Sequence, residues 1–243
     1  MPRGYPDWGV VTAQLGAPEF DTGEMAARIG SPYSYLRRGK VLFIDSFEIG
    51  WNSWRKSPGA TGSISLTTFQ PYHGAKAIKF VPPSGAGDYA GLLKYIPRII
   101  GRRVGVECMV GLVAGANTSI FSLEYFEVES AVASYWDAQI DADAGRLKYR
   151  NGLTLQSGFT NLAWEGAEQG LISYHHLKLV VDVVARELQE VWFNGTLYEP
   201  SNKTEQTIAA VGEPDHTFIN LQVYETASQA PIYVDAVTIT VDE

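Results

Sequence analysis

The segment from Ile172 to Tyr198 constrains the fold most strongly, because apolar residues alternate along it in two consecutive stretches. The first stretch carries an apolar side chain at every second position, at Leu177, Leu179, Val181 and Val183. A two-residue period is typical of a strand with one buried face. A turn at Ala185-Arg186 separates it from a second β-rich stretch that ends at Asn194-Gly195. We therefore predict a β-hairpin here and a core built from sheet.

The rest of the chain repeats this rhythm of short strands and turns, with no long helix between them. The pattern predicts strands at 41–47, 51–56, 63–70, 76–81, 89–96, 104–113, 119–128, 132–141, 146–150, 153–159, 216–225 and 232–240. Residues 200–214 are predicted to form a long loop. About a dozen strands fit an all-β, two-sheet antiparallel jelly-roll sandwich.

Three segments resemble those of a known family. They are Lys178-Leu-Val-Val-Asp182, Phe193-Asn-Gly195 and the closing strand at 232–240. Together they resemble the concanavalin A-like lectin/glucanase jelly rolls, of the kind found in tailed-phage virion proteins, over residues 41–243. The resemblance implies the sandwich fold. It also implies that a carbohydrate-binding module or a glycoside hydrolase is one functional class to consider.

Charge and hydropathy exclude several partners. The net charge of −8 and the pI near 5.1 would repel a phosphate backbone, so we predict no nucleic acid partner. No apolar run approaches the roughly 20 residues of a membrane helix, and the first ten residues lack the apolar core of a signal peptide. We therefore predict neither membrane insertion nor a signal peptide. The single cysteine, Cys108, shares a face with apolar residues and is predicted to be structural.

The first 39 residues differ in composition from the rest. Prolines and glycines interrupt any strand pattern, and Asp21 is placed to cap a short helix that ends near Ile29. We predict an N-terminal arm at 1–39 and a jelly-roll domain at 40–243. The apolar side chains that the arm would use for assembly are Tyr5, Trp8, Phe20, Met25 and Ile29.

Candidate catalytic residues are incomplete in the sequence. Glucanases of this class resemble one another in Glu-x-Asp followed by a second Glu, because retaining hydrolysis needs two neighbouring carboxyls. Here Glu124 begins such a run, but Phe126 stands in place of the Asp, and Glu127 and Glu129 face away from Glu124. Ser173 near His175 lacks the sharp turn that exposes a nucleophilic serine. We therefore predict no catalytic residues and no enzymatic activity.

A structural calcium ion is the one cofactor that the sequence suggests. Many jelly-roll carbohydrate-binding modules are similar in placing acids from the first and last strands around calcium, and Asp45, Glu48 and Asp235 would correspond. Asp45 is predicted on the Phe43 face and Asp235 on the Val237 face. The alternative is that these acids cap turns at strand ends.

One outward face combines aromatic, amide and acidic side chains. Its residues are Tyr135, Asp137, Gln139, Phe218, Asn220, Gln222 and Tyr224. This composition suits a glycan site, and it equally suits a protein–protein interface.

Two functions follow from these features. The first is a non-enzymatic structural protein of a virus or phage particle, either a capsid decoration or a tail component. It would be located in the virion and would assemble through its arm and sandwich faces as a homo-oligomer with other particle proteins. The alternative is a carbohydrate-binding module or glycoside hydrolase that recognises a glycan, including a surface glycan. An acidic chain with a loose arm favours the first.

Overall fold

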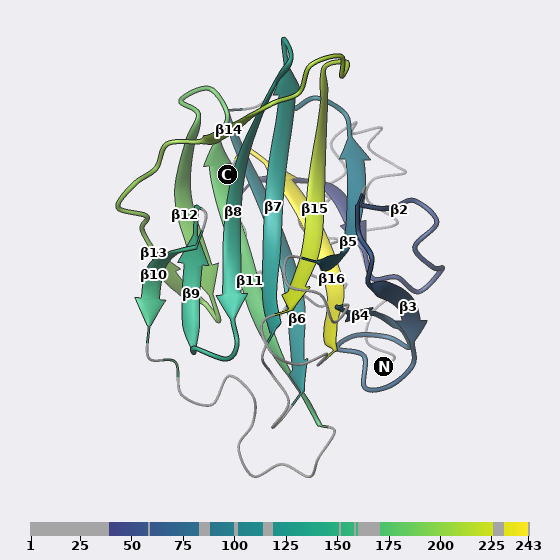
Figure 1. Ribbon diagram of the computed structural model, residues 1–243. Coiled ribbons are helices and arrows are strands. Elements are labelled where there is room, and N and C mark those ends of the chain that lie inside the picture. Colours follow the sequence, from purple (N-terminus) through teal and green to yellow (C-terminus); the bar gives the residue numbers. More distant parts are fainter. Residues whose placement is uncertain are drawn as a thin grey trace, which may run out of the picture.

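The computed structural model of the chain describes residues 39–57, 59–82, 88–99, 102–113, 119–150, 152–157, 159, 171–225 and 231–242. In this part of the chain every regular element is a strand, and the strands form two eight-stranded antiparallel sheets packed face to face (Figure 1). No helix among the described residues could span a membrane. The predicted arm, including its short helix, lies almost wholly outside the described residues, so the division at residue 39 stays a prediction.

The front sheet is the one nearer the viewer in Figure 1. Its strands, in spatial order, are β10 (Leu153–Ser157), β9 (Arg146–Tyr149), β8 (Val132–Asp141), β7 (Ser119–Glu129), β15 (His216–Glu225), β5 (Tyr89–Ile96) and β2 (Arg55–Lys56). The short strand β14 (Gln206–Ala209) pairs with β8 beside this series.

The back sheet holds the hairpin recognised first in the sequence. Its strands, in spatial order, are β13 (Thr196–Tyr198), β12 (Glu187–Phe193), β11 (Ile172–Asp182), β6 (Arg103–Val113), β16 (Ile232–Val241), β4 (Ala77–Val81) and β3 (Ser63–Thr67). Strand β1 (Lys40–Asp45) pairs with β16.

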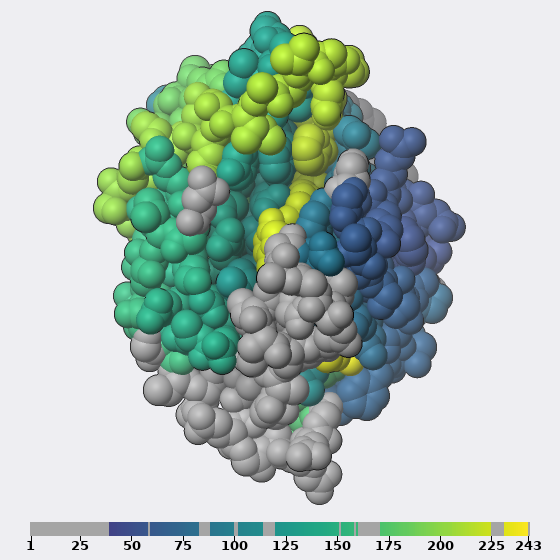
Figure 2. All heavy atoms as spheres, in the orientation of Figure 1, coloured from purple at the N-terminus to yellow at the C-terminus, as the bar shows by residue number. Residues whose placement is uncertain are grey.

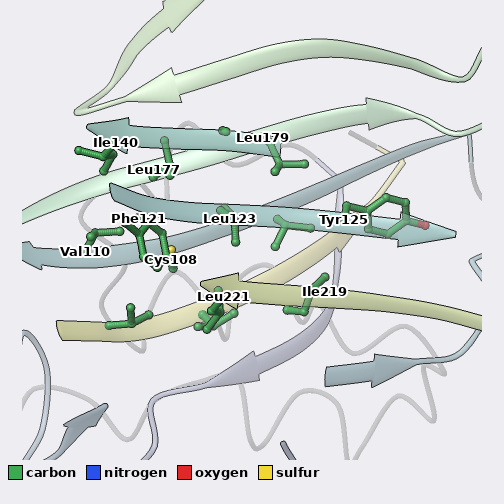
Figure 3. Close-up of a cluster of buried hydrophobic side chains, with 14 of the residues drawn as sticks. Cys108, Val110, Phe121, Leu123, Tyr125, Ile140, Leu177, Leu179, Ile219 and Leu221 are labelled. Carbon is green, nitrogen blue, oxygen red and sulfur yellow. The ribbon is translucent and has the colours of Figure 1, made fainter. Parts of the chain in front are cut away.

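The core lies between the two sheets, where alternate residues of every central strand meet. Leu123 and Leu221 from the front sheet and Leu177, Leu179 and Cys108 from the back sheet are all buried in it (Figure 3). Burying one such large apolar side chain contributes roughly 1.5–3 kcal/mol relative to leaving it exposed. Residues on the other side of each front-sheet strand are thereby directed outward.

The jelly-roll sandwich and most of its strands are confirmed. Strands β5 and β8 have the predicted bounds, and β11 pairs with β12 around the predicted turn, where Arg186 has a φ of 57°. In β15, Ile219, Leu221 and Val223 are fully buried, as the alternation predicts.

Three local predictions are wrong. The segment 51–56 forms only the two-residue strand β2, and the predicted loop at 200–214 contains β14. Asp235 does not share a face with Val237, because a β-bulge between Asp235 and Thr238, with Ala236 at a φ of 50°, reverses the alternation. Asp235 therefore lies opposite Met109 on the outer side of the back sheet.

Candidate functional site on the front sheet

Two acidic side chains lie directly opposite each other on the outward face of the front sheet. Glu124 of β7 is paired with Asp137 of β8 on one side and with Asn220 of β15 on the other. Both carboxyls are buried, with relative exposures of 5% for Glu124 and 2% for Asp137. Burial of two neighbouring carboxyls costs free energy unless their oxygens are hydrogen-bonded.

Glu124 receives that compensation from three donors. Ser122 Oγ donates to Oε1 at 3.0 Å, Asn220 Nδ2 donates to Oε2 at 3.0 Å, and the Tyr224 hydroxyl reaches Oε1 at 3.3 Å. Asn220 is fixed in turn, because its Oδ1 accepts a bond of 2.7 Å from Ser57 Oγ. The carboxyl of Glu124 is therefore held in one orientation.

Asp137 has a separate set of donors. Its Oδ1 accepts from the backbone N–H of Arg150 at 2.6 Å and from Gln206 Nε2 at 2.9 Å, while its Oδ2 accepts from Gln139 Nε2 at 2.6 Å. Gln206 comes from β14, and its Oε1 accepts a bond of 3.1 Å from the Tyr135 hydroxyl. Strand β14 thus completes the surroundings of Asp137.

The two carboxyls have pKa values near neutrality. Burial, aided by the charge of Asp137, raises the pKa of Glu124 from 4.5 to about 7, although its hydrogen-bond donors oppose the shift. Burial raises the pKa of Asp137 from 3.8 to about 6, although the hydrogen bonds that it accepts lower it. Between these values Glu124 is protonated while Asp137 is ionised.

Aromatic side chains lie on both sides of this polar floor. The ring of Phe126 stacks between Tyr135, at a centroid distance of 5.0 Å, and Phe218, at 4.5 Å. At the other end Tyr89 contacts Tyr224 at 5.8 Å. Stacked rings cover one another's faces, so Phe126 forms part of a wall and does not present a flat platform. Figure 2 shows this side of the molecule hollowed over β15.

The seven residues predicted as one face therefore do lie together, around Asp137 and Asn220. Their role as a glycan site or an interface stays a prediction. Glu124 was not predicted as part of this face, although the sequence holds a signal for it. Glu124 and Asp137 are equally far from the turn at Ser130-Ala131, so a hairpin about that turn pairs them.

Ser173 and His175 also meet, but not as a nucleophile and its base. Ser173 Oγ lies 3.3 Å from His175 Nε2. Asn194 Oδ1 accepts the N–H of His176, so its Nδ2 donates to His175 Nδ1 at 2.9 Å. The proton of the neutral imidazole is then on Nε2, which donates toward the serine and does not activate it.

The three predicted calcium ligands bind backbone N–H groups. Asp45 accepts from Phe47 N at 2.8 Å, whereas Glu48 and Asp235 hold the turn at 71–76 by accepting from Ala75 N at 2.8 Å and His73 N at 2.9 Å. Within the described ranges no group of three His, Cys, Asp or Glu could hold a metal ion. These hydrogen bonds agree with the turn-capping alternative.

Comparison with known proteins supports the fold. No protein-family profile and no curated protein sequence matches the chain. A carbohydrate esterase from the Shiga toxin-encoding bacteriophage phi24B has a similar structure, with a TM-score of 0.50 and 17% identity over 85% of this chain and 100% of that chain. The cellulose-induced protein Cip1 has a TM-score of 0.49 and 18% identity over 82% of this chain and 96% of that chain. A Bacillus licheniformis β-glucanase has a TM-score of 0.46 and 14% identity over 84% of this chain and 99% of that chain. Such likeness shows the jelly-roll fold alone.

The prediction that the chain is not an enzyme is wrong. The similar structures include enzymes, among them the phage carbohydrate esterase. The second carboxyl beside Glu124 does not lie on its own strand, as the Glu-x-Asp pattern requires, but is Asp137 on the neighbouring strand.

The raised pKa values predict pH-dependent stability. An acid with a raised folded-state pKa stabilises the fold at pH values below its unfolded pKa, and this contribution is lost as the pH rises through the folded pKa. We expect the free energy of unfolding to fall between pH 4.5 and 8, by about 2–3 kcal/mol for Glu124. Glu124→Gln should flatten this dependence in urea unfolding at pH 5 and pH 8. The exposed control Glu199→Gln should keep the pH dependence of the unfolding free energy. If Glu124→Gln also kept it unchanged, the raised pKa of Glu124 would be contradicted.

Calcium binding stays a prediction that a melting experiment decides. If calcium bridges Asp45, Glu48 and Asp235, the melting temperature should rise by several degrees on adding calcium to chelator-treated protein. Equal melting temperatures with calcium and with excess chelator would contradict the predicted calcium site.

Proposed function

We propose that the chain binds carbohydrate on the outward face of the front sheet, where Glu124 and Asp137 supply acid–base chemistry to the glycan. The observation that carries this proposal is the opposed carboxyl pair within a network of amides and hydroxyls. Sugars are bound by such convergent donors and acceptors, with aromatic side chains packing against their apolar C–H surfaces.

The pair suits retaining glycoside hydrolysis. Directly opposed side chains in an antiparallel sheet have Cβ atoms about 4.5–5.5 Å apart, so Glu124 and Asp137 can present their carboxyls to the same bond of a glycan. Retaining enzymes place two carboxyls on such a bond, roughly 5–5.5 Å apart. Glu124, with its pKa near 7, would protonate the glycosidic oxygen. Asp137, ionised at the same pH, would attack the anomeric carbon as its bond to the glycosidic oxygen breaks. Water would then hydrolyse the glycosyl ester, with the ionised Glu124 as the base. Asn220 and Tyr224 would orient Glu124 through their hydrogen bonds.

Substitution of the pair tests the proposal. Glycans that bind on an array are incubated with the protein, and release of reducing ends is measured. Glu124→Gln should lower the cleavage rate by roughly 10²–10⁴-fold while binding persists, and Asp137→Asn should do the same. Glu129→Gln, on the opposite face of β7, is the matched control. Full activity of Glu124→Gln would refute the assigned roles, and absence of any glycan binding would refute the function.

A place in a phage or virus particle is a second proposal, compatible with the first. It is supported by the composition of the first 39 residues and by the similar fold of a phage carbohydrate esterase. On this proposal the chain forms homo-oligomers and contacts other particle proteins, and its glycan is a surface glycan.

Truncation separates assembly from glycan binding. If the arm drives assembly, light scattering and electron microscopy should show oligomers for the full chain that disappear when residues 1–39 are deleted, with the melting transition of the sandwich retained. A full chain that stays monomeric over a wide concentration range would count against self-assembly.

A further inference from the structure

Strand β9, at the side of the candidate site, carries a row of cations. Arg146 and Lys148 alternate with Leu147 and Tyr149, which are buried in the core between the sheets. Arg146 and Lys148 therefore lie on the outward face of the front sheet, the face that holds Glu124 and Asp137. Arg150 follows directly after the strand.

The strand register places this row beside the polar floor. Lys148 pairs with Gln139, Arg146 pairs with Asp141, and the backbone of Arg150 donates to Asp137 Oδ1 at 2.6 Å. Strand β8 alone separates β9 from β7. With neighbouring strands about 4.8 Å apart, Arg150 lies roughly 10 Å from Glu124. Arg146 is four residues further along its strand and lies roughly 16 Å away, and a short oligosaccharide covers both spans.

The charges of the row are only partly used within the protein. Lys148 forms an ion pair with Asp141. Arg146 is exposed and has no ion pair in the described part of the chain. The Nη1 atom of Arg150 is buried without a hydrogen-bond acceptor among the described residues. Arg150 as a whole is only half-buried, so part of the residue is open to solvent, and a guanidinium is well suited to bind a carboxylate through two parallel N–H bonds.

From this placement we propose that the glycan is anionic, with carboxylates of uronic or sialic acid units bound by Arg146, Lys148 and Arg150. The inference rests on the proposed glycan binding and specifies its substrate class. The net charge of −8 makes a row of cations on one strand a local feature and not a consequence of composition. Neutral parts of the same glycan would lie over the amides of β8 and β15.

Matched ligands that differ only in charge test the inference. Calorimetry compares polygalacturonate with its methyl ester, and sialyllactose with lactose, at low and high salt. We expect the acidic member of a pair to bind at least roughly tenfold more tightly, with the preference reduced by salt. The double variant Arg146→Gln/Arg150→Gln should lose this preference, whereas the exposed control Lys56→Gln on β2 should keep it.

The remaining outcomes separate the two proposals. Equal binding of acidic and neutral members, unchanged in the double variant, would overturn the anionic substrate class and leave glycan binding intact. If neither these pairs nor any glycan on an array binds, the proposed function fails and this inference fails with it. Equally tight binding of single-stranded DNA would show a general polyanion surface and overturn the inference.

Discussion

The pairing of β7 with β8 is the interaction on which the candidate site depends. The turn at Ser130-Ala131 sets this register, and both of its residues have positive φ values, of 52° and 65°. Two consecutive positive φ values match the right-handed twist of the hairpin strands. A shift of one residue would turn Glu124 toward the core, because side chains alternate across a strand. The same register places Phe126 against Tyr135, so one turn aligns both the carboxyl pair and the aromatic wall.

The sandwich behind this hairpin keeps the pair in place at a cost in stability. Inward residues such as Leu123 and Ile140 pack both strands on the core, so the alternate residues of each strand are directed to the outward face. The carboxyls of Glu124 and Asp137 are buried among their neighbours on that face, and this burial raises their pKa values. Proteins commonly accept such local costs where binding or chemistry requires prepositioned groups. The donors around Glu124 and Asp137 limit the cost by keeping each oxygen hydrogen-bonded.

The fold could be predicted further than the site. Period-two alternation in 132–141 and 216–225 identified strands and faces correctly, because inward residues of a sandwich must be apolar. Contacts between strands are harder to predict from the sequence. Asp235 was assigned to the wrong face because a bulge is not visible in the alternation, and β14 was missed in a polar loop. Glu124 was compared with its own strand, although its partner lies across a Ser-Ala turn that lacks the usual Asn-Gly signal.

The central claim is that Glu124 and Asp137 form a coupled carboxyl pair on a binding face. The most direct measurement is a ¹³C NMR titration of side-chain carboxyl carbons, assigned with Glu124→Gln and Asp137→Asn. The account predicts that Glu124 titrates near pH 7 and Asp137 near pH 6, and that Asp137→Asn lowers the pKa of Glu124 because it removes the neighbouring negative charge. Titration of both groups near pH 4, each independent of the other, would contradict it.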